Sequence, residues 1–226
     1  MKQLAAKKVT VLALDSLPLP ALGENPEGGD QALGTQIKEW LAPWRADRLR
    51  VLVALPRSGV ELLYLTLPPA TDEELPELVT NLAVQESPTI SEQTLLDFLP
   101  SAGTPEAPRL VLAAALADEE QRRIRGRLAA AGLTPQRIVL RPLGGASLFR
   151  QLIASSDRTC LVINRIGQDV ELNLVAPGRI VFSRTVRLPE QASEEDVADR
   201  LVAEAKRTVL AAPREHVCDV GIQNVY

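Results

Sequence analysis

Hydrophobic residues recur at two spacings along this chain. In some segments they occupy every second position, and in others every third or fourth, which predicts a mixture of strands and helices. From 170 to 174, apolar residues alternate with Glu171 and Asn173, the pattern of a half-exposed strand. Pro177-Gly178 should turn that strand into a hairpin with a partner at 180–186. Continuous apolar runs of strand length predict further strands at 9–14, 49–55, 60–67, 94–99, 109–116, 137–140 and 159–164.

Apolar residues at helical spacing predict five helices: 30–44, 74–86, 118–131, 143–154 and a last helix that Ser193 should cap. Thr71 and Glu74 fit a capping box, but Pro76 would then remove a needed N–H, so the second helix should begin two or three residues later. Gly132 should end the third. The expected inward-facing residues are Leu75, Leu78, Val79 and Leu82 in the second helix, and Val197, Leu201, Ala205, Thr208 and Val209 in the last.

The order of elements in the middle of the chain is strand, helix, strand, strand, helix, from 60 to 131. Ferredoxin-like insertions have a related mixture, so we expect a small α+β subdomain within a larger α/β protein. The predicted boundaries are 59–136 for the inserted subdomain, and 1–58 with 137–226 for a discontinuous core. Trp40 and Trp44, at helical spacing, are expected to pack in or beside the core in preference to forming a ligand cage.

The amino-acid composition argues against some of the functions that the protein could have. The 226 residues are 46% hydrophobic and carry a formal net charge of −4, which argues against a general nucleic-acid binder. No apolar run reaches the length of a signal sequence or a membrane span, so we expect a cytoplasmic protein that does not insert directly into the membrane. Cys160 and Cys218 lie in apolar, strand-like contexts and should be buried free thiols.

Candidate chemistry is sparse. The one histidine, His216, and two distant cysteines offer no metal-ligand spacing. No nucleophile elbow, Walker loop or dinucleotide fingerprint is present. The arginines at 122, 123, 125 and 127 could suggest a phosphate site, but helical spacing scatters them, which favours a solvated face. We therefore predict no catalytic residues and no metal.

Three segments carry a resemblance to a known family. They are LPRSGVELLYLTLPPATDEELPELV, which begins at Leu55, then LAAAGLTPQRIVL at 128–140, and the strand, hairpin and helix of 160–207. Together they resemble PilM-like proteins, actin-fold cytoplasmic scaffolds of type IV pilus and related secretion machines, of the PilM and FtsA branch of the actin-like ATPases. The resemblance implies a partial actin-like (ribonuclease H-like) α/β fold that carries the inserted ferredoxin-like subdomain.

In such folds two glycine-containing hairpins with acidic residues grip ATP and magnesium. Asp15 has no glycine after it, so the first hairpin is missing, and the second reads Asn164-Arg165-Ile166-Gly167, with an amide for the acid. Glu204 and Arg207 keep the spacing of a helix pair that reaches the adenosine, although an exposed helix face explains them equally well. Asn164, Gly167, Glu204 and Arg207 are therefore only remnant candidates. We expect no cofactor, unless a longer natural chain binds ATP and magnesium.

The leading hypothesis is a non-catalytic scaffold that binds the cytoplasmic tail of a single-span inner-membrane protein, with a secretion motor ATPase as a further candidate partner. The strand at 60–67 and the loop at 68–71 could border the binding groove, where a strand edge would suit β-augmentation. An ordinary buried strand is the alternative for any residue there. Two other hypotheses remain: a fragment of a working actin-like ATPase, and an unrelated α/β protein with a small-molecule pocket.

Overall fold

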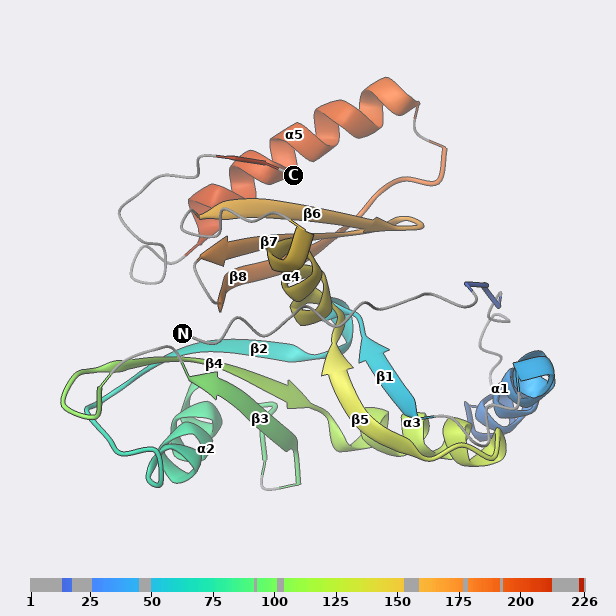
Figure 1. Ribbon diagram of the computed structural model, residues 1–226, viewed down its shortest axis with the longest axis horizontal. Helices are drawn as coiled ribbons and strands as arrows, with labels where there is room; N and C mark the ends of the chain where they lie inside the picture. Colours follow the sequence, from blue (N-terminus) through green and yellow to red (C-terminus); the bar gives the residue numbers. More distant parts are fainter. Residues whose placement is uncertain are drawn as a thin grey trace. The chain divides into compact units, whose positions relative to one another are not determined.

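The computed structural model describes residues 14–17, 26–44, 50–91, 93–100, 104–152, 159–176, 179–191, 193–212 and 224–225 (Figure 1). The chain divides into two compact units. One comprises Met1–Val51 with Arg123–Thr134, and the other Leu52–Arg122 with Pro135–Tyr226. These units are defined by internal packing and not by where one subdomain interrupts another. The boundaries at 59 and 136 therefore stay a prediction.

In the first unit, α1 (Pro26–Leu41) packs closely on the end of α3 (Asp118–Ala130). A Cβ on Gly34 would lie 2.3 Å from the Cβ of Ala130, so only glycine fits at this crossing. The 3₁₀ turn η1 (Ala42–Trp44) follows α1, and the rings of Trp40 and Trp44 meet edge to face with centroids 5.2 Å apart. Trp40 is half-buried, whereas Trp44 is 38% exposed, so Trp44 does not lie in the core.

The arginines of α3 are not all on a solvated face, so that prediction is partly wrong. Arg127 Nε lies 2.7 Å from Asp30 Oδ1, and Arg123 Nε lies 3.5 Å from Asp30 Oδ2, both side chains being half-buried. Arg122 and Arg125 are exposed. The difference arises because α1 brings a carboxylate against two of the four arginines, which the spacing within α3 alone does not reveal.

In the second unit, β2 (Glu61–Leu67), β4 (Arg109–Leu116) and β3 (Leu95–Pro100) form an antiparallel sheet in the order β2-β4-β3. The helix α2 (Leu75–Glu86) covers one face, as Figure 1 shows. It begins at Leu75 with Pro76 in its first turn, as predicted. The apolar residues buried between α2 and the sheet are Leu65, Leu67, Ala70, Leu75, Val79, Ala83, Ile90, Val111, Ala113 and Ala115.

A second sheet contains β6 (Cys160–Ile166), β7 (Asp169–Ala176), β8 (Arg179–Arg187) and β9 (Asn224–Val225), in the order β8-β7-β6-β9. The β7–β8 hairpin confirms the prediction, although Pro177-Gly178 lies outside the described residues. Val170, Leu172 and Leu174 pack toward α5 (Glu194–Ala211). The predicted cap of α5 is confirmed, since Ser193 and Asp196 form a capping box. Val209, expected to face inward, is exposed.

Four shorter elements remain to be described. β1 (Val51–Leu55) pairs with β5 (Pro135–Leu140), and the 3₁₀ turn η3 (Arg57–Gly59) leads from β1 into β2. The helix α4 (Arg141–Leu152) begins directly after β5, two residues earlier than predicted. Cys160 is buried as predicted, and burial raises its pKa. His216, Cys218 and most of the predicted strand at 9–14 lie outside the described residues.

The prediction that β7 is half-exposed is wrong. Glu171 and Asn173 are as deeply buried as the leucines between them. One face of β7 packs on α5, and the other is covered by α4, with η3 against the neighbouring β8. Polar residues at alternate positions therefore mark a second buried face here. No helix in the described part of the chain is long and apolar enough to cross a membrane.

Candidate partner-binding site

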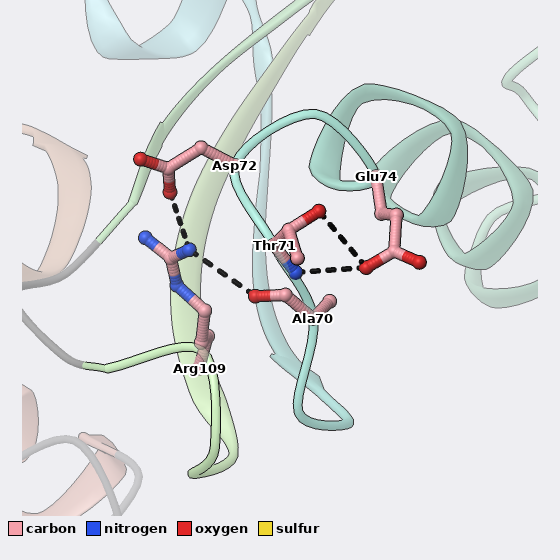
Figure 2. Close-up of polar contacts among 5 residues, drawn as sticks. All are labelled: Ala70, Thr71, Asp72, Glu74 and Arg109. Atoms are coloured by element: carbon pink, nitrogen blue, oxygen red, sulfur yellow. Dashed lines mark hydrogen bonds and ion pairs between the residues drawn. The ribbon is translucent and has the colours of Figure 1, made fainter.

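The loop that follows β2 is held in one conformation by a buried arginine (Figure 2). Arg109, the first residue of β4, stands opposite Leu67 and is only 6% exposed. Its Nη1 donates to the Ala70 carbonyl at 3.4 Å and to Asp72 Oδ1 at 2.5 Å, while Asp72 is 79% exposed. A charge-assisted bond from a buried donor to a surface carboxylate fixes where the loop leaves the sheet.

A second set of bonds closes the same loop at the start of α2. Glu74 Oε2 accepts from the Thr71 backbone N–H at 2.8 Å and from its hydroxyl at 3.0 Å, as Figure 2 shows. These two bonds, the backbone one first, hold the pKa of the Glu74 carboxyl below its usual range. Pro68 and Pro69 supply no backbone donors. The predicted loop therefore leaves β2 as an ordered turn with an acidic rim.

The strand β2 is an outer strand of its sheet among the described residues, and β4 pairs with it along its whole length. Leu65 and Leu67 are buried on the face that α2 covers, and Leu62 is buried on the opposite face, where Thr66 is exposed. β2 therefore lies at an edge of the sheet among the described residues, and its role as the border of a binding groove stays a prediction. The alternative of a buried strand holds for the side chains of the three leucines.

Two side chains, Tyr64 of β2 and Arg57 of η3, bond to the main chain of Ser183 on β8. The Ser183 backbone N–H donates to the Tyr64 hydroxyl oxygen at 2.7 Å, and Arg57 Nε donates to the Ser183 carbonyl at 3.2 Å. The rings of Tyr64 and Phe182 lie 5.8 Å apart. Burial raises the pKa of Tyr64 to about 12, although Arg57 and the Ser183 bond act in the opposite direction. Both main-chain groups of Ser183 are thus satisfied by side chains.

Glu171 forms the centre of a buried polar cluster beneath this contact. Its Oε1 accepts from the Arg57 backbone N–H at 3.1 Å and from Arg141 Nε at 3.0 Å, and Arg141 Nη2 lies 2.8 Å away as an ion-pair contact. Its Oε2 is buried and has no hydrogen-bond partner among the described residues. Nearby, the Ser183 hydroxyl donates to Asn173 Oδ1 at 2.6 Å. Sequence reasoning missed this cluster.

The remnant residues of the second phosphate hairpin lie at the β6–β7 turn. Asn164 is half-buried on β6, in register with Glu171 on β7. Gly167 has a φ of 62°, a conformation that favours glycine, and Arg165 Nε donates to its carbonyl at 3.1 Å. Arg165 thus closes its own turn, and its side chain is exposed.

Glu204 and Arg207 lie together on α5, where Glu204 forms ion pairs with both Arg207 and Arg184. Glu204 is buried, with Oε2 2.5 Å from Arg184 Nη2 and Oε1 2.6 Å from Arg207 Nη1. The expectation of an exposed helix face is therefore wrong for Glu204 and correct for Arg207. No described contact joins this pair to Asn164 or Gly167. Each Glu204 oxygen pairs with one arginine, and Asn164 carries an amide where the family has a carboxylate, so the four residues stay remnant candidates only.

Other chemistry is equally sparse in the described part of the chain, where no group of three or more His, Cys, Asp or Glu side chains could hold a metal. The residues that sequence reasoning overlooked are Arg57, Arg109, Arg141, Glu171 and Arg184. A buried strand with two polar residues at alternate positions was the available signal for Glu171. For the arginines, no local pattern distinguished them from surface ones.

Comparison with known proteins identifies the fold. No protein-family model matches the sequence, and no curated protein is similar to it. Among solved structures, a chain of the PilM–PilN type IV pilus biogenesis complex is similar, with a TM-score of 0.64 and 25% identity. That similarity covers 81% of this chain and 56% of the other. This chain therefore spans little more than half of the protein it matches.

Two further structures are similar at lower levels. The cytoplasmic domain of EpsL, an inner-membrane component of the type II secretion system of Vibrio cholerae, matches with a TM-score of 0.51 and 18% identity, over 70% of this chain and 57% of its own. At that identity the likeness shows the fold alone. A Bacteroides thetaiotaomicron protein with an actin-like ATPase fold and unknown function matches at 9% identity, over 77% of this chain and 62% of its own. Its TM-score of 0.41 adds nothing to the assignment. The resemblance to PilM-like proteins predicted from the sequence is confirmed, since the chain shares the fold of a chain of the PilM–PilN complex over most of its length.

Proposed function

We propose that the chain is a non-catalytic scaffold in the assembly platform of a type IV pilus or a type II secretion-like machine. It binds the cytoplasmic tail of a single-span inner-membrane protein and so lies on the cytoplasmic side, held at the membrane through that partner. A secretion motor ATPase is the second expected partner. The likeness to a chain of the PilM–PilN complex carries this proposal.

The outer edge of β2 and the loop behind it support the proposed place of tail binding. β-Augmentation requires an unpaired strand edge and an ordered border that fixes where the peptide stops. β2 offers such an edge among the described residues, and Arg109 and Glu74 hold the border in place. We also propose that 59–136 is an insertion between 1–58 and 137–226, so that the edge belongs to the inserted subdomain.

The first test is an affinity purification of the tagged protein from detergent-solubilised native cells, with partners identified by mass spectrometry. We expect to recover a single-span inner-membrane protein with a short cytoplasmic tail, together with a motor ATPase. Recovery of neither from cells that contain the folded protein would contradict the scaffold role.

The second test localises tail binding to β2. A synthetic peptide of the recovered tail is titrated against the protein by calorimetry, alongside two versions N-methylated on alternate residues. We expect one N-methylated version to lose binding, because strand addition uses the backbone N–H groups of alternate residues. Thr66→Lys on β2 should weaken binding, since lysine on an edge strand opposes pairing. The matched control is Leu99→Ser on β3, and loss of tail binding in that variant alone would move the site away from β2.

We further infer that this chain does not bind ATP, because Glu204 is engaged by Arg184 and Arg207. The measurement is a titration of the protein with ATP and magnesium, monitored by calorimetry. Saturable binding that Glu204→Gln weakens would contradict the inference and favour the alternative, an ATP-binding actin-like protein.

A further inference from the structure

Two cross-strand neighbours on the four-stranded sheet each carry a buried side-chain oxygen that has no hydrogen-bond partner among the described residues. They are Glu171 on β7 and Thr185 on β8, which stand directly opposite each other in the register of the two strands. The oxygens are Glu171 Oε2 and Thr185 Oγ1, and Glu171 is completely buried. Buried polar atoms in folded proteins are nearly always hydrogen-bonded, either to the chain or to water, so this pair requires an explanation.

The geometry of the two strands brings these side chains close together. In an antiparallel ladder, pairs that exchange main-chain bonds alternate with pairs that do not, and side chains lie closer in the second kind. Ser183, opposite Asn173, gives its N–H to Tyr64 and its carbonyl to Arg57, so neither group is directed at β7. Thr185 lies two residues further along β8 and therefore belongs to a pair of the same, closer kind.

The adjacent pair shows what such closeness permits. The Ser183 hydroxyl donates directly to Asn173 Oδ1 at 2.6 Å. Glu171 and Thr185 point to the same face of the sheet but make no direct bond among the described contacts. A single hydrogen-bonding group between them would satisfy both oxygens.

Arg141 contributes a third unsatisfied atom beside the same carboxylate. Its Nη2 lies 2.8 Å from Glu171 Oε1 as an ion-pair contact, but it is buried and makes no hydrogen bond among the described residues. The three atoms are therefore a donor on Arg141, an acceptor on Glu171 and a hydroxyl on Thr185 that can do either. A group that serves all three must both donate and accept.

The local charges favour a neutral species at this position. A cation would meet the guanidinium groups of Arg141 and Arg57, and an anion would meet the Glu171 carboxylate, so neither is favoured. Water is neutral and both donates and accepts. Buried water molecules typically make about three hydrogen bonds to polar groups that the chain itself leaves unsatisfied.

We propose that Glu171 Oε2, Thr185 Oγ1 and Arg141 Nη2 bind one buried water molecule. The water donates to Glu171, accepts from Arg141 and shares its remaining bond with the Thr185 hydroxyl. This site brings β8 into the polar network that already joins β7, η3 and α4 through Glu171. It does not depend on the proposed binding of a membrane-protein tail.

The test compares crystal structures of the full chain, as wild type, Thr185→Ser and Thr185→Val, at a resolution that shows ordered water. We expect a water molecule within hydrogen-bond distance of Glu171 Oε2 and the hydroxyl of residue 185 in the wild type and in Thr185→Ser, which keeps the hydroxyl. Thr185→Val replaces only the hydroxyl with a methyl group, so the water should be lost. Circular dichroism establishes that each variant is folded.

A solution measurement provides an independent readout. Magnetic relaxation dispersion of the water oxygen-17 nucleus counts water molecules that stay in the protein for a long time. The wild type and Thr185→Ser should each hold one more such molecule than Thr185→Val. A wild-type structure without this water, a direct bond from Thr185 to Glu171 in its place, the same water retained in Thr185→Val, or equal counts in all three proteins would each overturn the proposal.

Discussion

The three-stranded and the four-stranded sheet of the second unit differ in how their two faces are covered. Both are covered on one face by a helix, α2 on the three-stranded sheet and α5 on the four-stranded one, through apolar side chains. On the second face of the four-stranded sheet, a fully buried glutamate, Glu171, lies beneath η3 and α4. On the second face of the three-stranded sheet, Leu95, Asp97 and Leu99 of β3 are exposed.

This difference separates two kinds of stabilisation. An apolar face tolerates changes that conserve volume, because dispersion and the hydrophobic effect depend little on direction. A buried ion pair is tied to geometry, and removal of one partner leaves an uncompensated charge. The Glu171 cluster therefore joins β7, η3 and α4 in one specific arrangement, whereas the α2 core requires only apolar residues of suitable size.

The largest effect is expected for Glu171→Ala. Loss of the carboxylate leaves Arg141 without its counter-charge and the Arg57 N–H without its acceptor, and should lower the free energy of unfolding by about 4 kcal/mol. Urea denaturation measures this change. The double variant Glu171→Leu with Arg141→Met should recover most of the loss, because replacing both charges with apolar groups is nearly neutral. A double variant no more stable than Glu171→Ala would show that the geometry of the cluster, and not its charge, matters.

Leu67→Ala tests the apolar side of the comparison. This side chain is almost fully buried beneath α2, so its truncation should cost about 3 kcal/mol through lost transfer energy and a residual cavity. The same urea measurement on Leu67→Met should show a loss of less than about 1.5 kcal/mol, because volume is nearly conserved. Equal losses in both variants would mean that this core is as dependent on exact shape as the Glu171 cluster.

Tyr64 links the two sheets and makes stability depend on pH. The pKa of Tyr64 is about 12 in the folded chain against 10.0 for the free group, so the unfolded chain releases the proton first as pH rises. Stability is then full below pH 10 and falls between 10 and 12, by about 1.4 kcal/mol at pH 11. Urea denaturation from pH 8 to 11 measures the slope. Tyr64→Phe should remove this part of it, and an unchanged slope in that variant would assign it to other groups.

The smallest change is expected at the cap of α5. Ser193→Ala removes the acceptor for the Asp196 N–H and should cost about 1 kcal/mol. Ser193→Asp, which keeps a capping oxygen, serves as the control and should lose much less. Thermal unfolding of the three proteins measures the difference. A loss of several kcal/mol in Ser193→Ala would indicate that α5 contributes more through its first turn than through the apolar face it presents to β7.

The elements that could be predicted from the sequence are those set by local pattern. The order of β2, α2, β3, β4 and α3 is correct, the start of α2 follows from Pro76, and the Ser193 cap follows from Asp196 three residues later. Each depends on residues within a few positions of one another. The end of β2 at Leu67 follows in the same way from Pro68 and Pro69.

The site could be predicted only in part, because its key contacts join distant residues. Arg57 and Glu171 are separated by 114 positions and Arg109 and Asp72 by 37. Whether a charged residue of a strand or helix is exposed depends on what covers it. Glu171 and Glu204 were misjudged on this ground, because α4, η3 and Arg184 lie elsewhere in the sequence. The inward position predicted for Val209 is also wrong, because Thr208 and Ala212 occupy the buried side at the end of α5 and Val209 lies on the exposed side.

The long separation within the Glu171 cluster has a consequence for the order of folding. Closing the chain between Arg57 and Glu171 costs more conformational entropy than forming the β3–β4 or β7–β8 pairs, so the local hairpins should form before it. The Glu171 carboxylate should therefore stay hydrated during the early steps of folding. It should lose its water only when α4 and η3 pack against β7 and β8. Substitutions at Arg141 should therefore accelerate unfolding and leave the folding rate nearly unchanged, which makes this cluster a determinant of how long the folded state persists.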